Sequence, residues 1–162
     1  MSARFPPGRV DADLVFPDLR ERTLHGVLLE ISERLAAAGV VRDAAELAER
    51  LSKRERDGCT GMGGGIAFPH CRMDGLPGVV AAVGLSHAGV DFGAADGKPI
   101  TVLFVLLSPR DEPALHLQAL AWLTRLARTP GLIEELRRAV SKEDAARALR
   151  EAENGSSAAA TA

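Results

Sequence analysis

The segment 60–70, TGMGGGIAFPH, constrains the fold of this chain more than any other stretch. Four of its first six residues are glycine, so the backbone can turn sharply and approach a ligand without a Cβ in the way. Residues 66–68 form an apolar run that predicts a short buried strand. Pro69 fixes the φ angle just before His70 and removes one sheet hydrogen-bond donor. We expect a rigid loop of free backbone N–H groups beside an imidazole, an arrangement suited to binding phosphate.

Length and composition narrow the class of protein. The chain has 162 residues, enough for one domain with a substantial core, and its formal net charge of −2 gives no basic patch for nucleic acid or anionic membrane. The cysteines, Cys59 and Cys71, are too few for a disulfide framework and favour a reducing compartment. No stretch has the form of a signal peptide or a membrane span. We therefore expect a cytoplasmic protein with no direct membrane insertion and no nucleic-acid partner.

Hydrophobic periodicity and turn residues predict helices and strands on both sides of the glycine-rich segment. Asp43 and Ser141 are suitable N-cap residues, and Pro113 suits the first turn of a helix. The almost wholly apolar run 99–107 is expected to form a central strand that is buried on both faces. We expect helices at 22–38, 44–54, 113–128, 132–139 and 142–152, and strands at 14–16, 66–68, 79–85, 90–92 and 99–107.

This order of elements predicts an α/β fold, a three-layer α/β/α domain in which a mixed β-sheet is flanked by helices. The domain is expected to span residues 14–152. Residues 1–13 are interpreted as a flexible lead-in, and the small, polar residues 153–162 as a disordered tail. We find no internal repeat and no second domain in the sequence.

His70 is the first candidate for a reactive group. A lone histidine at the end of a strand usually packs and binds a local carbonyl, but the glycines and the proline before it favour a functional role. A neutral imidazole can attack a phosphoryl group, provided that one ring nitrogen is held as N–H and the other presents its lone pair. Metal binding is the rival role, but Cys71 points to the opposite face of an extended chain. We expect neither a metal nor a cofactor.

Three further residues could assist His70. His116 falls in the first turn of the helix expected at 113–128, where it could pack in the core or donate to a phosphoryl oxygen. Arg54 ends the preceding helix; it could be solvated, but its guanidinium could also bind phosphoryl oxygens as a fork. Thr60 could donate its hydroxyl or initiate a turn, and Asp96 is interpreted as a turn residue.

A series of short motifs follows the same order as in a known family. These motifs are Arg54-Glu55, Thr60-Gly61, Gly65-Ile66-Ala67, Pro69-His70, Asp96-x-x-Pro99-Ile100 and His116-Leu117-x-x-Leu120. The series resembles the signature of type 2 enzyme IIA proteins of the bacterial phosphoenolpyruvate-dependent sugar phosphotransferase system, and the resemblance covers roughly residues 14–151. Because the chain is about as long as the stand-alone nitrogen-regulatory IIA proteins, it resembles that branch more than the fructose or mannitol transporter components.

The resemblance implies that His70 accepts a phosphoryl group from the carrier protein HPr or a nitrogen-branch HPr-like protein. The group would then pass to a IIB domain, or phosphorylation would regulate a partner protein such as a kinase or transporter. Arg54 and His116 would support the phosphorylated imidazole. The residues expected to line the phosphoryl pocket are Thr60, Gly61 and Gly65.

Two expectations from the residues stand beside this resemblance. Met62 and Phe68 are expected to form an apolar rim that partner proteins contact. The alternative function is a non-catalytic regulatory or anion-binding module of the same fold, in which His70 would not carry a phosphoryl group.

Overall fold

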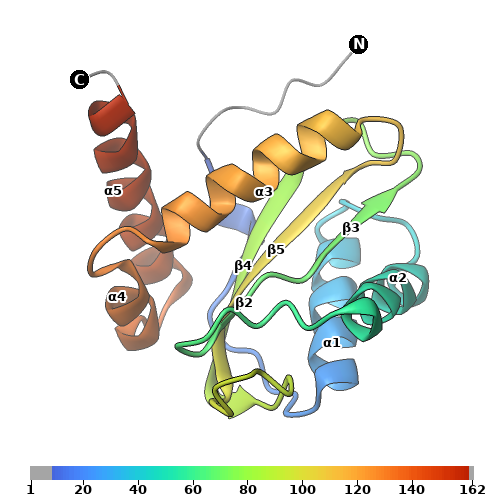
Figure 1. Ribbon diagram of the computed structural model, residues 1–162, viewed down its shortest axis with the longest axis horizontal. Helices are drawn as coiled ribbons and strands as arrows, with labels where there is room; N and C mark the ends of the chain where they lie inside the picture. The colour runs from blue at the N-terminus through green and yellow to red at the C-terminus, as the bar shows by residue number, and fades with distance from the viewer. Residues whose placement is uncertain (1–8, 161–162) are drawn as a thin grey trace.

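The computed structural model describes residues 9–160, with the side chains of 157–160 outside that description. A mixed sheet lies between two groups of helices (Figure 1). The elements are the short 3-10 helix η1 (Ala12–Leu14), β1 (Val15–Phe16), α1 (Leu24–Ala37), α2 (Ala44–Asp57), β2 (Ile66–Ala67), β3 (His70–Met73), β4 (Val80–Val90), β5 (Ile100–Pro109), α3 (Pro113–Ala127), α4 (Leu132–Arg138) and α5 (Lys142–Ala160). None of the helices within the described residues is both long and apolar enough to cross a membrane.

Strand β5 organises the sheet. It pairs antiparallel with β4 on one side and parallel with both β2 and β3 on the other, while β1 pairs parallel with β4. Ile66 lies opposite Val102, and His70 lies opposite Leu106. Since a strand rises about 3.3 Å per residue, His70 lies about 13 Å further along β5 than the start of β2.

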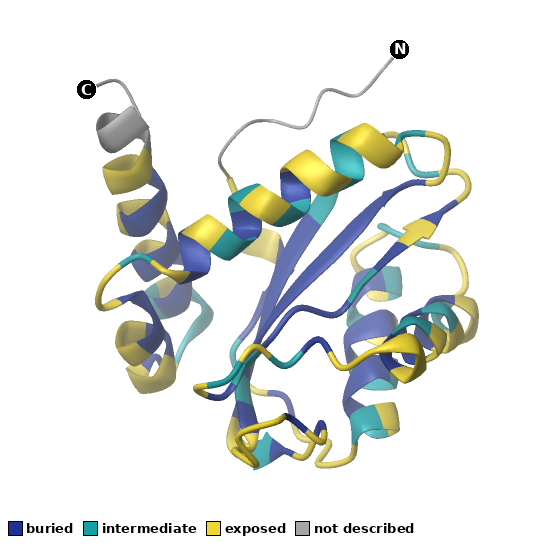
Figure 2. Cartoon of the chain, in the orientation of Figure 1, coloured by how far each residue is buried: buried dark blue, intermediate teal, exposed yellow. Residues whose placement is uncertain are grey.

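The two faces of β5 supply both halves of the core, because successive side chains of a strand point to opposite faces. Phe104 and Leu106 pack with residues of α3, α4 and α5, whereas Leu103 and Val105 pack with residues of α1 and α2. Strands β4 and β5 are accordingly buried along most of their length (Figure 2). The expected α/β/α architecture and the doubly buried central strand are confirmed.

Several helix starts also follow the predicted chemistry. The Asp43 carboxylate accepts a hydrogen bond from the Glu46 N–H at 3.0 Å, and the Ser141 hydroxyl oxygen accepts one from the Asp144 N–H at 3.1 Å. Pro113 occupies the first helical position of α3, where its missing N–H costs no hydrogen bond. The predicted helix starts at 44, 113, 132 and 142 agree with the structure, whereas α1 begins at Leu24 and not at the expected residue 22.

The strands differ from the prediction at two places. Strand β3 was not expected; Pro69 separates it from β2, yet the Pro69 carbonyl still accepts the Leu106 N–H at 3.0 Å. The two strands expected at 79–85 and 90–92 are one strand, β4, with a shift of register between Leu85 and Val90. A β-bulge interrupts the alternation of side chains without ending the strand.

Both ends of the predicted domain need correction. Helix α5 continues to Ala160, so the disordered tail expected at 153–162 is wrong for residues 153–160. Glu153 is buried, and its carboxylate accepts the Val10 N–H at 2.7 Å. Val10 is buried in the core and η1 follows it, so the flexible lead-in expected at 1–13 is wrong for residues 9–13. The remaining residues of both segments lie outside the described part of the chain.

The two-sided burial of β5 leads to a stability prediction. Leu103 is fully buried, whereas Leu117 on α3 is 67% exposed. We expect Leu103→Ala to lower the free energy of unfolding by about 2–5 kcal/mol, because the substitution leaves a cavity in the core. Leu117→Ala, the same chemical change at the surface, should alter it by less than about 0.5 kcal/mol. Urea denaturation of the two variants measures the difference, and equal losses would contradict this assignment of the core.

Candidate functional site

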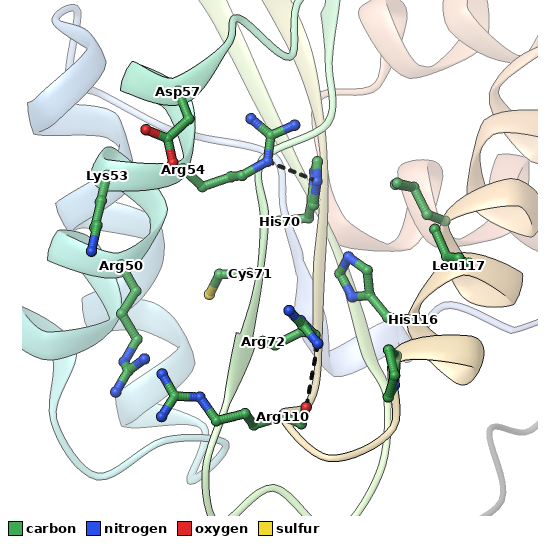
Figure 3. Close-up of a pocket in the computed structure, with 12 residues that line it drawn as sticks. Arg50, Lys53, Arg54, Asp57, His70, Cys71, Arg72, Arg110, His116 and Leu117 are labelled. Atoms are coloured by element: carbon green, nitrogen blue, oxygen red, sulfur yellow. Dashed lines mark hydrogen bonds between the residues drawn. The ribbon is translucent and has the colours of Figure 1, made fainter.

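A cleft of about 640 Å³ opens at the edge of the sheet (Figure 3). Strand β3 lies between its two walls, which are the last turns of α2 from one helical layer and the first turns of α3 from the other. The residues that line the cleft are Arg50, Lys53, Arg54, Asp57, His70, Cys71, Arg72, Arg110, Pro113, His116, Leu117 and Leu120. The structure therefore brings together three of the predicted site residues, Arg54, His70 and His116.

The hydrogen bonds of His70 define its tautomer. Its Nδ1 lies 2.7 Å from the carbonyl oxygen of Phe68, which can only accept, so Nδ1 carries the proton. Its Nε2 lies 3.2 Å from Nε of Arg54, which can only donate, so Nε2 presents its lone pair. Two independent partners thus assign the same neutral tautomer and leave Nε2 as the nucleophilic nitrogen.

Arg54 is held in place by the end of its own helix. It lies in the last turn of α2, where backbone carbonyls lack partners within the helix, and its Nη1 donates to the Gly58 carbonyl at 3.0 Å. This bond directs Nε of the guanidinium towards His70. The same side chain therefore binds the chain at the end of its helix and places a positive charge at Nε2 of His70.

His116 faces His70 from α3. The two imidazole rings have centroids 5.4 Å apart and are tilted by 43°. Nδ1 of His116 is hydrogen-bonded to the hydroxyl of Ser108, a fully buried residue near the end of β5. Because Nδ1 is engaged with Ser108, Nε2 is the ring nitrogen of His116 that remains to interact with a group bound in the cleft.

The electrostatics of the cleft favour neutral imidazoles. Burial lowers the pKa of His70, and the charge of Arg54 acts in the same direction. Burial also lowers the pKa of His116, to about 4, with His70 and the guanidinium groups of Arg72 and Arg54 contributing. Both rings are therefore neutral near pH 7, which is the state required of a nucleophile.

Cys71 presents different chemistry. Burial raises the pKa of its thiol to about 12, so the thiolate is not populated near neutral pH. Its low exposure and its place on β3 agree with a packing role for this side chain. The described residues contain no group of three or more His, Cys, Asp or Glu side chains positioned to hold a metal ion.

The glycine loop, residues 60–65, does not line the cleft, contrary to the prediction. Thr60 is buried, and its N–H and hydroxyl both donate to the Glu55 carboxylate, at 2.6 and 2.8 Å. The Gly61 N–H faces the Cys59 sulfur at 3.3 Å, and the Gly65 carbonyl accepts from the backbone of β5. These three residues, Thr60, Gly61 and Gly65, therefore make hydrogen bonds within the protein, and none of them is among the residues that line the cleft.

The position of the loop in the sheet explains this correction. Gly65 directly precedes β2, so it lies more than 10 Å from His70 along the direction of β5. Gly63, Gly64 and Gly65 all have positive φ angles, from 67° to 85°, and form a tight turn. Asp96 fixes this turn, since its carboxylate accepts the Gly64 N–H at 2.8 Å. The N–H groups of Thr60, Gly61, Met62 and Gly64 are thus already engaged with protein acceptors.

The expected apolar rim also needs correction. Phe68 is buried and stacks on Phe104 at a centroid distance of 5.4 Å, so it belongs to the core. Met62 is exposed but does not line the cleft. The apolar side chains that α3 contributes to the cleft are instead Pro113, Leu117 and Leu120.

Sequence reasoning missed several residues that shape the site. Ser108 gave one usable signal, because it is the first polar residue after the apolar run of β5. The Phe68 carbonyl gave none, since every residue has one. Arg72 gave a weak signal, because residues two apart on a strand share a face and His70 was already a candidate.

Comparisons with known proteins agree with this geometry. Residues 10–152 match the family model described as "Phosphoenolpyruvate-dependent sugar phosphotransferase system, EIIA 2". The chain is 36% identical over 129 residues to the nitrogen regulatory protein of Pseudomonas aeruginosa, covering 80% of this chain and 84% of that protein. It is 34% identical over 121 residues to the fructose-specific EIIA component of Haloferax volcanii, covering 75% and 79% of the two chains.

A solved structure gives the same result. The fold matches the crystal structure of the nitrogen regulatory protein IIA-Ntr from Neisseria meningitidis with a TM-score of 0.76 and 28% identity, covering 86% of this chain and 95% of that chain. The chain belongs to the type 2 EIIA family of the phosphoenolpyruvate-dependent sugar phosphotransferase system. Both the expected fold and the expected family are confirmed.

The low pKa of His116 gives a pH prediction. An unfolded histidine binds a proton near pH 6.5, whereas the native His116 does so near pH 4. The unfolded state therefore binds more protons between these values, and the free energy of unfolding should fall as the pH is lowered through that window. NMR titration of the ring nitrogens should place the His116 midpoint near 4, and His116→Asn should reduce the acid-induced loss of stability. A midpoint near 6.5 would contradict the effect of burial.

Proposed function

We propose that this protein is a phosphocarrier whose His70 Nε2 accepts a phosphoryl group from an HPr-like protein and passes it on. The observation that carries the proposal is the pair of hydrogen bonds that holds Nδ1 as N–H on Phe68 and leaves the Nε2 lone pair facing Arg54. The family to which the chain belongs supports the same class of reaction. The proposed acceptor is either a IIB domain or a protein that responds to the phosphorylation state of His70.

The proposed step balances without a metal or cofactor. The Nε2 lone pair attacks phosphorus while the bond between phosphorus and the donor's ring nitrogen breaks, and the bonding pair stays on that nitrogen. The other ring nitrogen of the donor carries a proton, so the donor histidine leaves as a neutral ring, and His70 becomes a phosphorylated ring that keeps its proton at Nδ1. The Phe68 carbonyl stabilises this proton, because the ring gains positive charge as the new bond forms.

Arg54 and His116 have distinct roles in this proposal. The Nε2 lone pair is lost on phosphorylation, so the Arg54 guanidinium exchanges a nitrogen acceptor for phosphoryl oxygens, which bind it more strongly. The neutral ring of His116 donates from Nε2 when the Ser108 hydroxyl donates to its Nδ1. Phosphoryl transfer depends mainly on such positioning and charge stabilisation.

The relatives support two uses of the phosphoryl group, regulation of a partner protein and transfer towards a sugar. One is named a nitrogen regulatory protein and another a fructose-specific EIIA component. We propose that phosphorylation of this protein regulates a partner, since nitrogen regulatory proteins are among both the sequence and the structural relatives. The non-catalytic alternative retains the cleft but never carries a phosphoryl group.

The test of carrier function is direct labelling. Incubation with phosphoramidate, or with phosphoenolpyruvate, enzyme I and an HPr-like carrier, should place one phosphoryl group on the wild-type protein. The label should be lost in acid, kept in base and absent from His70→Ala. Phosphorus NMR of the labelled protein should assign the bond to Nε2. A wild-type protein that no donor labels would leave only the non-catalytic alternative.

Arg54 provides a second prediction. Arg54→Ala should lower the rate of labelling by phosphoramidate about 100-fold or more, because the transition state loses a positive charge beside the phosphoryl oxygens. The matched control is Arg56→Ala, on the same helix but exposed and paired with Glu49 outside the cleft. Thermal unfolding should show that both variants remain folded. Equal rates for Arg54→Ala and the control would refute the role of Arg54.

A further inference from the structure

The cleft around His70 carries more positive charge than one phosphoryl group needs. Its lining contains five cationic side chains, Arg50, Lys53, Arg54, Arg72 and Arg110, and a single carboxylate, Asp57. The whole chain has a formal net charge of −2, so this excess is a local feature and does not follow from composition. Carboxylates outside this lining pair with two of the cations, Glu46 with Arg50 at 3.0 Å and Asp74 with Arg110 at 3.3 Å, and the excess of positive charge that remains lies around His70.

The five cations fall into two groups. Arg54 binds His70, and Arg54 together with Arg72 acts on the charge state of His116. The outer cations, which we define as Arg50, Lys53 and Arg110, lie further from the rings. Arg50 precedes Arg54 by about one turn of α2, which is about 6 Å along the helix axis.

Arg110 is the clearest example of an outer cation that lies away from the imidazole ring of His70. Its backbone N–H donates to the Met73 carbonyl at 3.0 Å, and Met73 lies three residues, about 10 Å, along β3 from His70. The Arg110 side chain is 58% exposed, and its ion pair with Asp74 at 3.3 Å lies at the surface. Such exposed pairs contribute little energy and are readily exchanged for another carboxylate.

The opposite wall of the cleft is apolar. Leu117 is 67% exposed and Leu120 is partly buried, and both come from α3. Protein interfaces commonly combine an apolar centre with charged residues around it. The cleft therefore has an apolar wall on α3 and a positively charged wall on α2 and the β3 side.

Transfer between two proteins requires the partner to cover this surface. The reacting atoms must approach to about 3–3.5 Å, and a standard interface buries about 800 Å² of each partner, a disc of about 16 Å radius. A disc of that size centred on His70 includes the outer cations. A carrier with a basic face would place like charges opposite them, at a cost that disfavours docking.

We propose that the carrier protein that exchanges a phosphoryl group with His70 docks through an acidic face. Aspartate or glutamate side chains around its own phosphorylated histidine contact Arg50, Lys53 and Arg110, and an apolar side chain packs on Leu117. This inference rests on the proposed carrier function. Opposite charges accelerate encounter by about 10–10³-fold at low salt, so the outer cations determine which carrier is used.

The experiment compares two carriers of the same fold. One is an HPr-type carrier whose exposed residues around its histidine are basic, and the other is that carrier with those residues changed to glutamate. Both are phosphorylated and mixed with this protein at about 50 mM salt. The acidic-faced carrier should transfer with a kcat/KM at least about tenfold higher, and added salt should reduce the difference. Equal transfer, or faster transfer from the basic-faced carrier, would overturn the proposal.

Charge reversal locates the effect in the cleft. Lys53→Glu combined with Arg110→Glu should lower the kcat/KM for the acidic-faced carrier, relative to that for phosphoramidate, by about tenfold or more. The control, Arg22→Glu combined with Arg128→Glu, makes the same change in net charge at exposed sites outside the cleft and should leave this ratio unchanged. Both double variants are checked for folding by urea denaturation.

Two further outcomes separate the alternatives. If the cleft double variant slows phosphoramidate as much as it slows the carrier, the outer cations bind the small phosphoryl donor itself, and the docking proposal is overturned. If neither phosphoramidate nor either carrier labels the wild-type protein, the carrier function itself fails, and the docking proposal fails with it. Labelling by phosphoramidate together with no preference between carriers overturns the docking proposal alone.

Discussion

The hydrogen bond from His70 Nδ1 to the Phe68 carbonyl is the interaction on which the site depends. A free imidazole exchanges its proton between two nitrogens, so its nucleophilic lone pair has no fixed direction. The Phe68 carbonyl, 2.7 Å from Nδ1, keeps the proton on that nitrogen, and Arg54 donates a hydrogen bond to the other nitrogen, Nε2. The carbonyl is itself held by the path of the chain between β2 and β3. A local property of the fold thus selects the ring nitrogen that presents its lone pair.

The supporting side chains converge because each layer of the fold contributes one of them. The edge strand β3 supplies His70, helix α2 from one layer supplies Arg54, and helix α3 from the other supplies His116. The buried hydroxyl of Ser108 connects this last residue to the central strand. The site is therefore built on rigid elements, which suits a reaction that depends on positioning.

Much of this arrangement could be predicted from the sequence, for identifiable reasons. The apolar run of β5 is long and β-branched, so its central position followed from composition alone. Histidine and arginine in a motif that a known family shares identified His70, Arg54 and His116. The sharp turn expected of the glycine loop is present, but the expected phosphate site beside His70 depended on the distance between them, which the pairing of β2 and β3 with β5 determines. No local pattern of residues in the sequence specifies this register. The length of α5 was missed because its last residues are small and polar, and its contact with Val10 is remote in sequence.

Pro69 has one more consequence, which concerns the edge of the sheet. Strands β2 and β3 lie outermost beside β5, where unpaired backbone groups commonly recruit strands from other molecules. Residues 60–62 already pair with the β2 part of this edge, through a bridge between Gly61 and Ala67. Proline lacks an N–H, and here it breaks this edge into two short pieces. Another chain finds no continuous ladder to extend, so this flank resists self-association into larger sheets. His70 can therefore lie on an outer strand of the sheet without promoting aggregation there.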